Sequence, residues 1–188
     1  ERCTMVTRIA HLLEKHGALE FGDFVLASGA RSSYYLNIKR VVTQPGALRE
    51  IADVITRGYT FDMVAGVAVG GVPLAVAVSL ASGKPFAIIR SQEKSHGKSG
   101  RIIGDVRGKK VLLVEDVTTS GGSALFGIQV LRDEGATVDT VVTVVDRESG
   151  AAALLRENGV SLDALVRASE IVAGKTRTAT VKTTGSDT

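Results

Sequence analysis

The sequence is poor in the residues that build disulfides and metal clusters. Its 188 residues include a single cysteine, Cys3, three histidines and no tryptophan. One cysteine excludes an internal disulfide and a cysteine-based metal cluster, and it suits a reducing compartment such as the cytoplasm. His11 and His16 are five residues apart, which is not the spacing of a paired metal site on a helix.

A strong excess of charge is also lacking. Lysine and arginine number 23 against 20 acidic residues, which gives a net charge of +3. This excess is compatible with phosphorylated small molecules and too weak to indicate binding to nucleic acid. No Gly-x-x-x-x-Gly-Lys-Ser/Thr loop occurs, and no Gly-x-Gly-x-x-Gly follows a predicted strand. Two common kinds of nucleotide-binding loop are therefore excluded.

Only one segment, residues 63–83, is uncharged and long enough to span a bilayer. Gly70 and Gly71 interrupt it in the middle, and Pro73 suits the first turn of a helix. We therefore predict a buried strand, a glycine turn and a helix instead of a transmembrane span, and we expect no membrane partner. Charged residues within the first 15 positions also argue against a signal peptide.

The chain does contain an alternation of apolar strands with amphipathic helices. With 44% hydrophobic and 23% charged residues, the composition is that of a globular domain, and the length allows one α/β domain with a small appendage. Residues 21–37 predict a strand, a turn and a strand. Residues 174–188 lack periodicity and predict a disordered tail. The predicted strands are 64–69, 85–89, 111–114, 137–145 and 161–166, and the predicted helices include residues 6–13, 45–55, 73–82, 124–131 and 151–158.

The chain is organised around residues 111–123. A buried strand is followed by two carboxylates, Glu115 and Asp116, at the carboxyl end where open α/β sheets bind ligands. The acids can hold hydroxyl groups or a metal. The next residues lead into a helix, so free backbone N–H groups and the helix dipole favour an anion, such as the phosphate of a 5-phosphorylated sugar. An ordinary polar turn with solvated acids is the alternative. The turn comprises Val117, Thr118, Thr119, Ser120, Gly121, Gly122 and Ser123.

Two further polar segments follow predicted strands. The turn Gly70–Gly71 could form a second nest of backbone N–H groups for an anion, or only a close connection between strand and helix. Residues 90–101 contain four cations, His96 and no apolar residue, which predicts a mobile loop. The strand before this loop is predicted to lie beside the 111–114 strand, so the cations could close over a polyanion. A solvated surface loop is the alternative.

Arg147 follows the predicted strand 137–145. An arginine in this position can hold a carboxylate or an imide edge with two hydrogen bonds. The alternative is a helix start in which Ser149 caps the helix 151–158. Tyr34 and Tyr35 lie beside a Ser-Gly turn and could stack on a planar base. Spacing alone favours an ordinary strand with one ring in the core and one outside.

Residues 115–123 resemble the phosphoribosyl-pyrophosphate (PRPP) signature of the type I phosphoribosyltransferases. The chain up to about residue 172 resembles one family within this group, the orotate phosphoribosyltransferases, through four motifs in the same order. Residues 26–37 resemble the segment that covers the base, and residues 90–97 resemble the mobile catalytic loop. Residues 146–148 place Arg147 at the position of the arginine that binds orotate.

The resemblance implies an α/β fold of the type I phosphoribosyltransferase kind, with a central, mostly parallel sheet flanked by helices and a small N-terminal hood. It implies one domain over residues 1–172, with the hood at about 1–40 and the core at about 41–172, followed by a disordered tail at 173–188. The implied reaction transfers the 5-phosphoribosyl group from PRPP to orotate, giving orotidine 5′-monophosphate and pyrophosphate in pyrimidine biosynthesis. Mg²⁺ is the implied cofactor, and a homodimer with shared active sites is the implied assembly.

The resemblance also implies the roles of individual residues. Arg90, Lys94 and His96 would neutralise pyrophosphate, and Glu115 and Asp116 would hold the ribose hydroxyls. Mg²⁺ would be bound mainly through PRPP and water, with Asp116 as the one candidate ligand. The implied catalytic residues are Lys94, Arg90, His96 and Asp116; the PRPP-binding residues are Arg90, Lys94, His96, Glu115, Asp116, Val117, Thr118, Thr119, Ser120, Gly121, Gly122 and Ser123; the orotate-binding residues are Thr119, Arg147, Tyr35 and Leu36; and Gly70 and Gly71 form the pyrophosphate turn.

Three lysines of the better-known bacterial pattern are absent, and Ala27, Gly70 and Ser91 stand in their places. These departures leave the predicted fold and PRPP binding unchanged and concern the efficiency of catalysis. Two alternative functions share the 115–123 motif. A purine phosphoribosyltransferase would not need the 28–37 segment or Arg147 in these places. A PRPP-binding regulator of the same fold is favoured only by the missing lysines.

Overall fold

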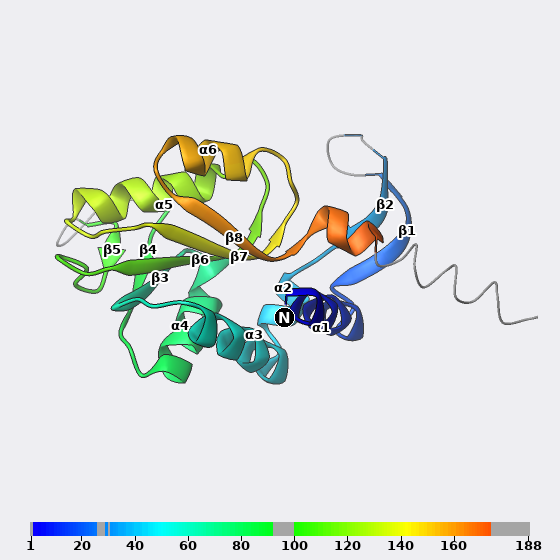
Figure 1. The fold of residues 1–188 in the computed structure, drawn as a ribbon, viewed down its shortest axis with the longest axis horizontal. Coiled ribbons are helices and arrows are strands. Elements are labelled where there is room, and N and C mark those ends of the chain that lie inside the picture. The colour runs from blue at the N-terminus through cyan, green and yellow to red at the C-terminus, as the bar shows by residue number, and fades with distance from the viewer. Residues whose placement is uncertain (1, 26–28, 30, 92–99, 174–188) are drawn as a thin grey trace, which may run out of the picture.

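The computed structural model describes residues 2–25, 29, 31–91 and 100–173, and it shows a layered α/β arrangement (Figure 1). Within these residues the chain forms two sheets, a small antiparallel pair near the N-terminal helix and a six-stranded sheet at the centre of the molecule. The central strands lie in the order β5, β4, β3, β6, β7 and β8, and all are parallel except the edge strand β5. The prediction of a mostly parallel sheet flanked by helices is confirmed.

The elements follow the predicted pattern in order and type. The central strands are β3 (Met63–Val67), β4 (Phe86–Ile89), β5 (Ile102–Ile103), β6 (Val111–Thr118), β7 (Thr140–Asp146) and β8 (Ser161–Arg167). The helices are α1 (Arg2–Lys15), α2 (Lys39–Val42), α3 (Pro45–Gly58), α4 (Gly71–Ser82), α5 (Gly122–Asp133) and α6 (Ala151–Glu157). The small sheet consists of β1 (Leu19–Val25) and β2 (Arg31–Leu36).

Three elements are not indicated by the sequence pattern, because all of them are short. β5 has two residues, α2 has four, and a helical turn at 168–173 follows β8 directly. Segments of this length contain too few residues to show a period. β7 begins at Thr140 and not at residue 137, where an isolated bridge joins the chain to Lys110. The tail predicted at 173–188 lies outside the described residues from position 174 onward.

Alternation along β6 divides the apolar core into two layers, since successive side chains of a strand point to opposite faces of the sheet. Leu112 and Val114 belong to the cluster that includes α3 and α4, whereas Val111 and Leu113 belong to the cluster that includes α5. Figure 1 shows α3 and α4 on one side of the sheet and α5 and α6 on the other. All four side chains are at most 4% exposed. This strand is therefore buried on both faces, as predicted.

The N-terminal hood, formed by α1, β1 and β2, is attached to the core through α1. This helix contacts both β1 and β8, and an ion pair joins Arg8 of α1 to Glu50 of α3. In β2, alternation puts Tyr34 and Leu36 on the face that packs against the core. Tyr35 lies on the other face and is 45% exposed. The prediction of one ring inside and one outside is confirmed.

The uncharged segment 63–83 folds as predicted into β3, a glycine turn and α4. Among the described residues, no helix is long and apolar enough to cross a membrane. The turn is tight: a side-chain carbon placed on Gly66 would lie 2.3 Å from the carbonyl oxygen of Gly71, and one on Gly71 would lie 2.6 Å from that of Val114. Only glycine permits this approach, so α4 starts directly against β3 and β6.

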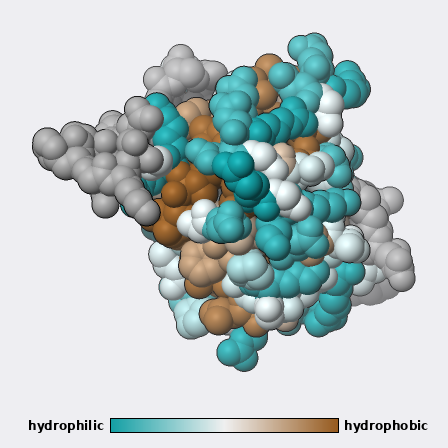
Figure 2. Space-filling model, turned by 90° about the vertical axis from the view of Figure 1, so that its left-hand side faces the viewer, coloured by the Kyte–Doolittle hydropathy of each residue, from teal (hydrophilic) through white to brown (hydrophobic). Residues whose placement is uncertain are grey.

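Hydrophobic side chains reach the surface at the end of the molecule that carries β4 and β5. Figure 2 views this end and shows several hydrophobic areas, of which the broadest lies left of the centre of the view. Phe86 of β4 and Ile103 of β5 are 37% and 45% exposed. The two-residue strand β5 therefore covers the edge of the central sheet only in part.

Replacement of Gly66 by alanine is expected to lower the free energy of unfolding by about 2–4 kcal/mol, because the added carbon would meet backbone atoms that cannot move aside. Gly58→Ala is the matched control. Gly58 ends α3 with nothing within 4 Å of the added carbon, and a change within about 1 kcal/mol is expected. Urea unfolding measures both variants. Equal stability of the two would contradict the close packing of α4 against β3.

Candidate active site

The carboxyl ends of β3, β6 and β7 lie side by side at one edge of the central sheet. The chain runs from β3 outward to β4 and β5 and then returns to β6 on the other side of β3. The strand order therefore reverses between β3 and β6, and open α/β sheets bind their ligands at such a point. The acids of β6, the turn before α4 and the turn after β7 all lie at this edge, which is the candidate active site.

Glu115 and Asp116 lie within β6, because the strand continues to Thr118 by pairing with β7. The expectation that the strand ends before the two acids is therefore corrected. Their environments differ, since successive residues of a strand face opposite sides. Glu115 is only 5% exposed, whereas Asp116 is partly exposed.

Burial raises the pKa of Glu115 to about 7, because the ionised carboxylate loses contact with water. The hydroxyl of Ser123 donates a hydrogen bond of 3.0 Å to Glu115 Oε1 and lowers this pKa, while the neighbouring charge of Asp116 raises it. Near neutral pH, Glu115 is therefore protonated in about half of the molecules. The free site presents less negative charge to an anionic ligand than two ordinary acids would.

Asp116 lies against the glycine turn that precedes α4. A side-chain carbon on Gly70 would lie 2.5 Å from Asp116 Oδ1, so the carboxylate occupies space that any other residue at position 70 would need. The same oxygen accepts a hydrogen bond of 2.9 Å from the backbone N–H of Val117. The absence of a lysine at position 70 and the place of the Asp116 carboxylate are thus linked.

The turn after β6 leads into α5, as predicted. Gly121 has a φ of 87° and directly precedes the helix, whose first N–H groups have no partner within the helix itself. The first turn of α5 contains no acidic residue, and the Cα of Gly122 faces open space. Thr119 and Ser120 are exposed. Backbone N–H groups and two exposed hydroxyls are therefore available to a phosphate.

Two of the four hydroxyls in residues 118–123 are used inside the protein. Thr118 donates to Asp146 Oδ1 at 3.1 Å, and Ser123 donates to Glu115 at 3.0 Å. A hydroxyl has a single hydrogen, so Thr118 and Ser123 cannot donate to a ligand while these bonds are present. The binding of a phosphate by Thr118 and Ser123 stays a prediction, and it would require these hydroxyls to leave their present partners.

Arg147 lies directly beside the turn after β6. Its backbone N–H donates a hydrogen bond of 2.9 Å to the carbonyl oxygen of Thr118. The backbone N–H of Ala151 donates one of 3.2 Å to the carbonyl oxygen of Thr119. The guanidinium carbon of Arg147 lies 5.7 Å from the centre of the Tyr34 ring, which is a cation–π contact. Arg147 of the core therefore contacts the hood through Tyr34 of β2.

Tyr34 is the neighbour of Arg147, and the expected Tyr35 is not. Tyr35 lies on the opposite face of β2, where its ring centre is 5.6 Å from that of Phe24. Leu36 shares a face with Tyr34 and packs against the core. The two-residue alternation of β2 would have found Tyr34, because it lies two positions from the apolar Leu36.

The segment 146–150 does not cap a helix with a side chain. α6 is preceded by Gly150, which has a φ of 105°, and no side chain caps its first turn. The Ser149 hydroxyl donates instead to the carbonyl oxygen of Arg147 at 3.4 Å. The alternative role of Ser149 as a helix cap is therefore wrong.

The cationic segment 90–101 starts and ends at the carboxyl end of β4. The prediction that this strand lies beside the 111–114 strand is wrong, because β3 pairs with both and separates β4 from β6. The N–H of Arg90 donates to the carbonyl oxygen of Arg101 at 2.7 Å, which brings the two ends together. The guanidinium carbon of Arg101 lies 5.2 Å from the centre of the Phe126 ring on α5 and anchors the returning end. The sequence pattern assigns Arg101 no separate role. Lys94 and His96 lie outside the described residues, so their roles stay predictions.

The acids of β6 are the oxygen donors available to a metal in the candidate active site. Among the described residues, no group of three or more histidine, cysteine, aspartate or glutamate side chains could hold a metal ion. Mg²⁺ commonly takes one or two carboxylates together with substrate phosphates. Asp116 is partly exposed and suits this use better than the buried Glu115. The donor set fits Mg²⁺ that is bound mainly by a polyphosphate ligand.

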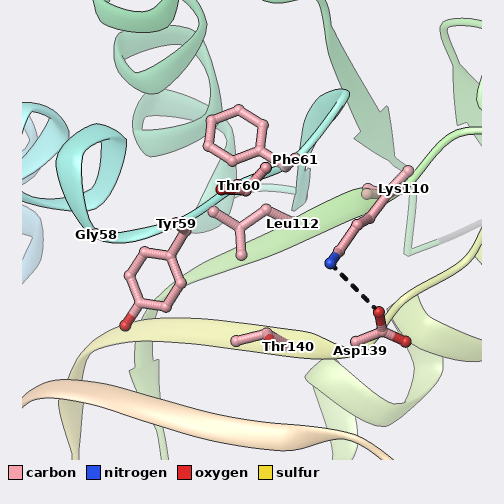
Figure 3. Close-up of a pocket in the computed structure, with 9 residues that line it drawn as sticks. Gly58, Tyr59, Thr60, Phe61, Lys110, Leu112, Asp139 and Thr140 are labelled. Atoms are coloured by element: carbon pink, nitrogen blue, oxygen red, sulfur yellow. Dashed lines mark ion pairs between the residues drawn. The ribbon is translucent and has the colours of Figure 1, made fainter.

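A separate pocket of about 180 Å³ lies at the opposite edge of the sheet, at the amino ends of β3, β6 and β7. Figure 3 shows Lys110 and Asp139 paired beside it, with 3.7 Å between Nζ and Oδ2. The two side chains are 51% and 57% exposed, so solvent screens this pair. The pocket is not part of the candidate active site.

Comparison with known proteins agrees with this geometry. A family profile described as "Phosphoribosyl transferase domain" matches residues 37–155. The orotate phosphoribosyltransferase of Methanoculleus marisnigri is 65% identical over 170 residues, which cover 90% of this chain and 100% of that protein. The crystal structure of orotate phosphoribosyltransferase from Aeropyrum pernix has a TM-score of 0.78 and 37% identity, and it covers 88% of this chain and 97% of that chain. The Mycobacterium tuberculosis H37Rv enzyme in complex with PRPP has a TM-score of 0.70 and 30% identity over 87% and 98% of the two chains.

The raised pKa of Glu115 predicts a pH-dependent stability of the free protein. The folded chain keeps the proton up to about pH 7, whereas the unfolded chain releases it near the ordinary value of 4.5. Between these values the folded state binds more protons, so its stability falls as the pH rises. Glu115→Gln removes this titration. Relative to that variant, the parent should lose about 3 kcal/mol of unfolding free energy between about pH 4.5 and about pH 7.5.

Urea unfolding of both proteins at the two pH values, without ligand, measures this difference. Every other titrating group is present in both proteins, so the difference between the parent and Glu115→Gln reports on Glu115 alone. A stability difference between the two proteins that stays constant with pH would contradict the buried, raised state of Glu115.

Proposed function

The chain belongs to the orotate phosphoribosyltransferase family, and we propose which of its residues carry out each part of the reaction. The enzyme transfers the 5-phosphoribosyl group of PRPP to orotate and forms orotidine 5′-monophosphate and pyrophosphate. The assignment of residues rests on one observation: Glu115, Asp116 and the 119–122 turn lie at the point where the strand order reverses. The relatives do not support the alternatives of a purine enzyme or a PRPP-binding regulator.

Glu115 and Asp116 bind the ribose hydroxyls. As the bond to pyrophosphate breaks, positive charge develops on the ribose ring, and the two acids stabilise that charge. Burial strengthens this effect for the ionised form of Glu115, because charges interact more strongly away from water. The N–H groups of the 119–122 turn, with the hydroxyls of Thr119 and Ser120, bind the 5-phosphate at the start of α5.

Cationic and backbone groups near β3 and β4 bind the departing pyrophosphate. Asp116 is the candidate residue to hold Mg²⁺, which would be bound mainly through PRPP and water and would supply positive charge to this leaving group. The proposed role of the loop after β4 is supported by its sequence pattern. It is also supported by the hydrogen bond that joins Arg90 to Arg101 and by the contact of Arg101 with α5. Loop closure would exclude water that otherwise hydrolyses PRPP. The proposed pyrophosphate-binding residues are Arg90, Lys94, His96, Gly70 and Gly71.

Arg147 binds orotate through its planar guanidinium, which can hold a carboxylate or an imide edge with two hydrogen bonds. The ring of Tyr34 lies against this guanidinium and restricts its orientation. Thr119 lies beside the same turn, since its carbonyl oxygen accepts the N–H of Ala151. Leu36 contributes an apolar side chain to the face of the hood that packs against the core. Base recognition thus combines the core and the hood.

A homodimer with shared active sites is the proposed assembly, and the surface of α3 and α4 supports it. α4 contains no charged residue, and a helix that is apolar all round is normally buried all round. Leu80 of α4 is nevertheless 81% exposed, beside an apolar groove of about 410 Å³ between α3 and α4. A protruding apolar residue next to an apolar groove is self-complementary, as a two-fold interface requires. Arg49 and Asp53 flank the groove and could pair across the same axis.

A cytoplasmic location is part of the proposal. A single cysteine, Cys3, cannot form a disulfide within the chain, which suits a reducing compartment. The net charge of +3 gives no reason to propose nucleic acid or an acidic membrane as a partner.

Replacement of Arg147 by alanine is expected to raise the orotate KM and lower kcat. The loss in kcat/KM should be about 2–4 kcal/mol, because a charge-assisted pair is removed, while the PRPP KM should change little. Arg156→Ala is the matched control, since Arg156 is an exposed arginine at the end of α6. Steady-state kinetics with each substrate varied in turn measures both variants. Unchanged orotate turnover in Arg147→Ala would refute the assignment.

If each catalytic loop serves the partner's site, two inactive variants should restore activity when they are mixed. The variants are Lys94→Ala in the loop and Asp116→Asn in the PRPP site. In a mixed dimer one site then has both defects and the other has none. Random reassortment makes about half of the dimers mixed, so about a quarter of the parent activity should return.

Native mass spectrometry confirms that mixed dimers form. In the control, both variants also carry Leu80→Glu, which puts a charge into the proposed interface and should prevent pairing and restoration. If mixed dimers form and no activity returns, each loop serves its own subunit, and the shared-site assembly is refuted.

A further inference from the structure

The turn that carries Arg147 has a strained backbone. Glu148 has a φ of 56°, and it is the one residue other than glycine with a positive φ in the described part of the chain. Side chains other than glycine rarely adopt this left-handed conformation. Such a conformation persists only where the surrounding structure holds it, and it is found most often at functional sites.

The first group of hydrogen bonds that holds Glu148 acts on its backbone. Its N–H donates to Asp146 Oδ1 at 3.0 Å, and the same oxygen accepts the hydroxyl of Thr118 at 3.1 Å. Asp146 is 4% exposed, so these bonds are shielded from water. Through Asp146, these bonds link the Glu148 backbone to the end of β6.

The second group acts on the side chain, which reaches the helical turn at 168–173. Glu148 Oε2 accepts the backbone N–H of Ser169 at 2.7 Å, and Oε1 accepts the Ser169 hydroxyl at 3.0 Å. Both carboxylate oxygens are therefore engaged, and a carboxylate is favoured beside the free N–H groups at the start of a helical turn. Arg147 thus lies between two residues that are each held by hydrogen bonds.

We propose that Glu148 is a positioning residue, which holds Arg147 in the orientation that binds orotate by joining the Arg147 turn to Ser169. This inference rests on the proposed binding of orotate by Arg147. When the bonds to Ser169 are absent, the Glu148 N–H keeps its bond to Asp146, but the turn is no longer attached to the helical turn at 168–173. The Arg147 side chain then leaves its place against Tyr34, and orotate binding weakens while PRPP binding does not.

Two variants and a control separate positioning from folding. Glu148→Gly removes the side chain and also relieves the backbone strain, so the protein should fold with at least its parent stability. Its orotate KM should rise about tenfold, while its PRPP KM should change by less than about twofold. Glu148→Gln keeps an oxygen acceptor of the same shape and should restore the orotate KM to near the parent value. Glu157→Ala, an exposed glutamate at the end of α6, should change neither constant.

A double variant distinguishes this inference from the proposed role of Arg147. If Glu148 acts through Arg147, adding Glu148→Gly to Arg147→Ala should raise the orotate KM no further. An unchanged orotate KM in Arg147→Ala would refute the proposed binding of orotate by Arg147 itself. If Arg147→Ala raises that KM and Glu148→Gly does not, the positioning role is overturned and the role of Arg147 stands. Additive effects, or an equal rise in both KM values for Glu148→Gly, would also overturn the positioning role.

Discussion

The close contact of three backbone segments, at Gly66, Gly71 and Val114, determines where the ligands of this enzyme can lie. Because no side chain separates them, α4 begins directly against β3 and β6. The turn before α4 is thereby pressed against the carboxylate of Asp116, with no room for a side chain at position 70. The contact at position 70 is with the end of the Asp116 side chain, so a side chain there would require that carboxylate to move.

The two neighbouring acids of β6 can coexist near a polyphosphate because their environments differ. Burial keeps Glu115 largely protonated below about pH 7, and the Ser123 hydroxyl stabilises its ionised form. Asp116 is partly exposed and accepts a backbone N–H. The same strand that contributes apolar side chains to the core thus also carries two carboxylates of different character. A polyanion can approach this pair more easily than it could approach two fully charged acids.

The sequence predicts the order and type of the long elements, since their periods extend over many residues. It also predicts that residues 115–123 and Arg147 lie at one edge of the sheet, because parallel strands bring their carboxyl ends together. It cannot predict which hydroxyls are already bonded within the protein, as Thr118 is, because such contacts depend on side chains from another strand. The strained Glu148 and its bond to Ser169 join positions 21 residues apart, and no local pattern indicates them. The choice of Tyr34 over Tyr35 could have been made from alternation alone.

The hood and the core belong to separate sheets, which has a consequence for how this enzyme can evolve. Among the residues that the structure describes, β1 and β2 pair only with each other, whereas the strand that carries the acids and the proposed phosphate-binding turn belongs to the central sheet. Mutations in the hood can therefore alter the surface offered to the base without shifting the phosphate-binding backbone. Selection can act on base preference through the few residues around Tyr34, while the phosphoribosyl site is inherited unchanged. Related enzymes with different bases can arise in this way from one ancestral core.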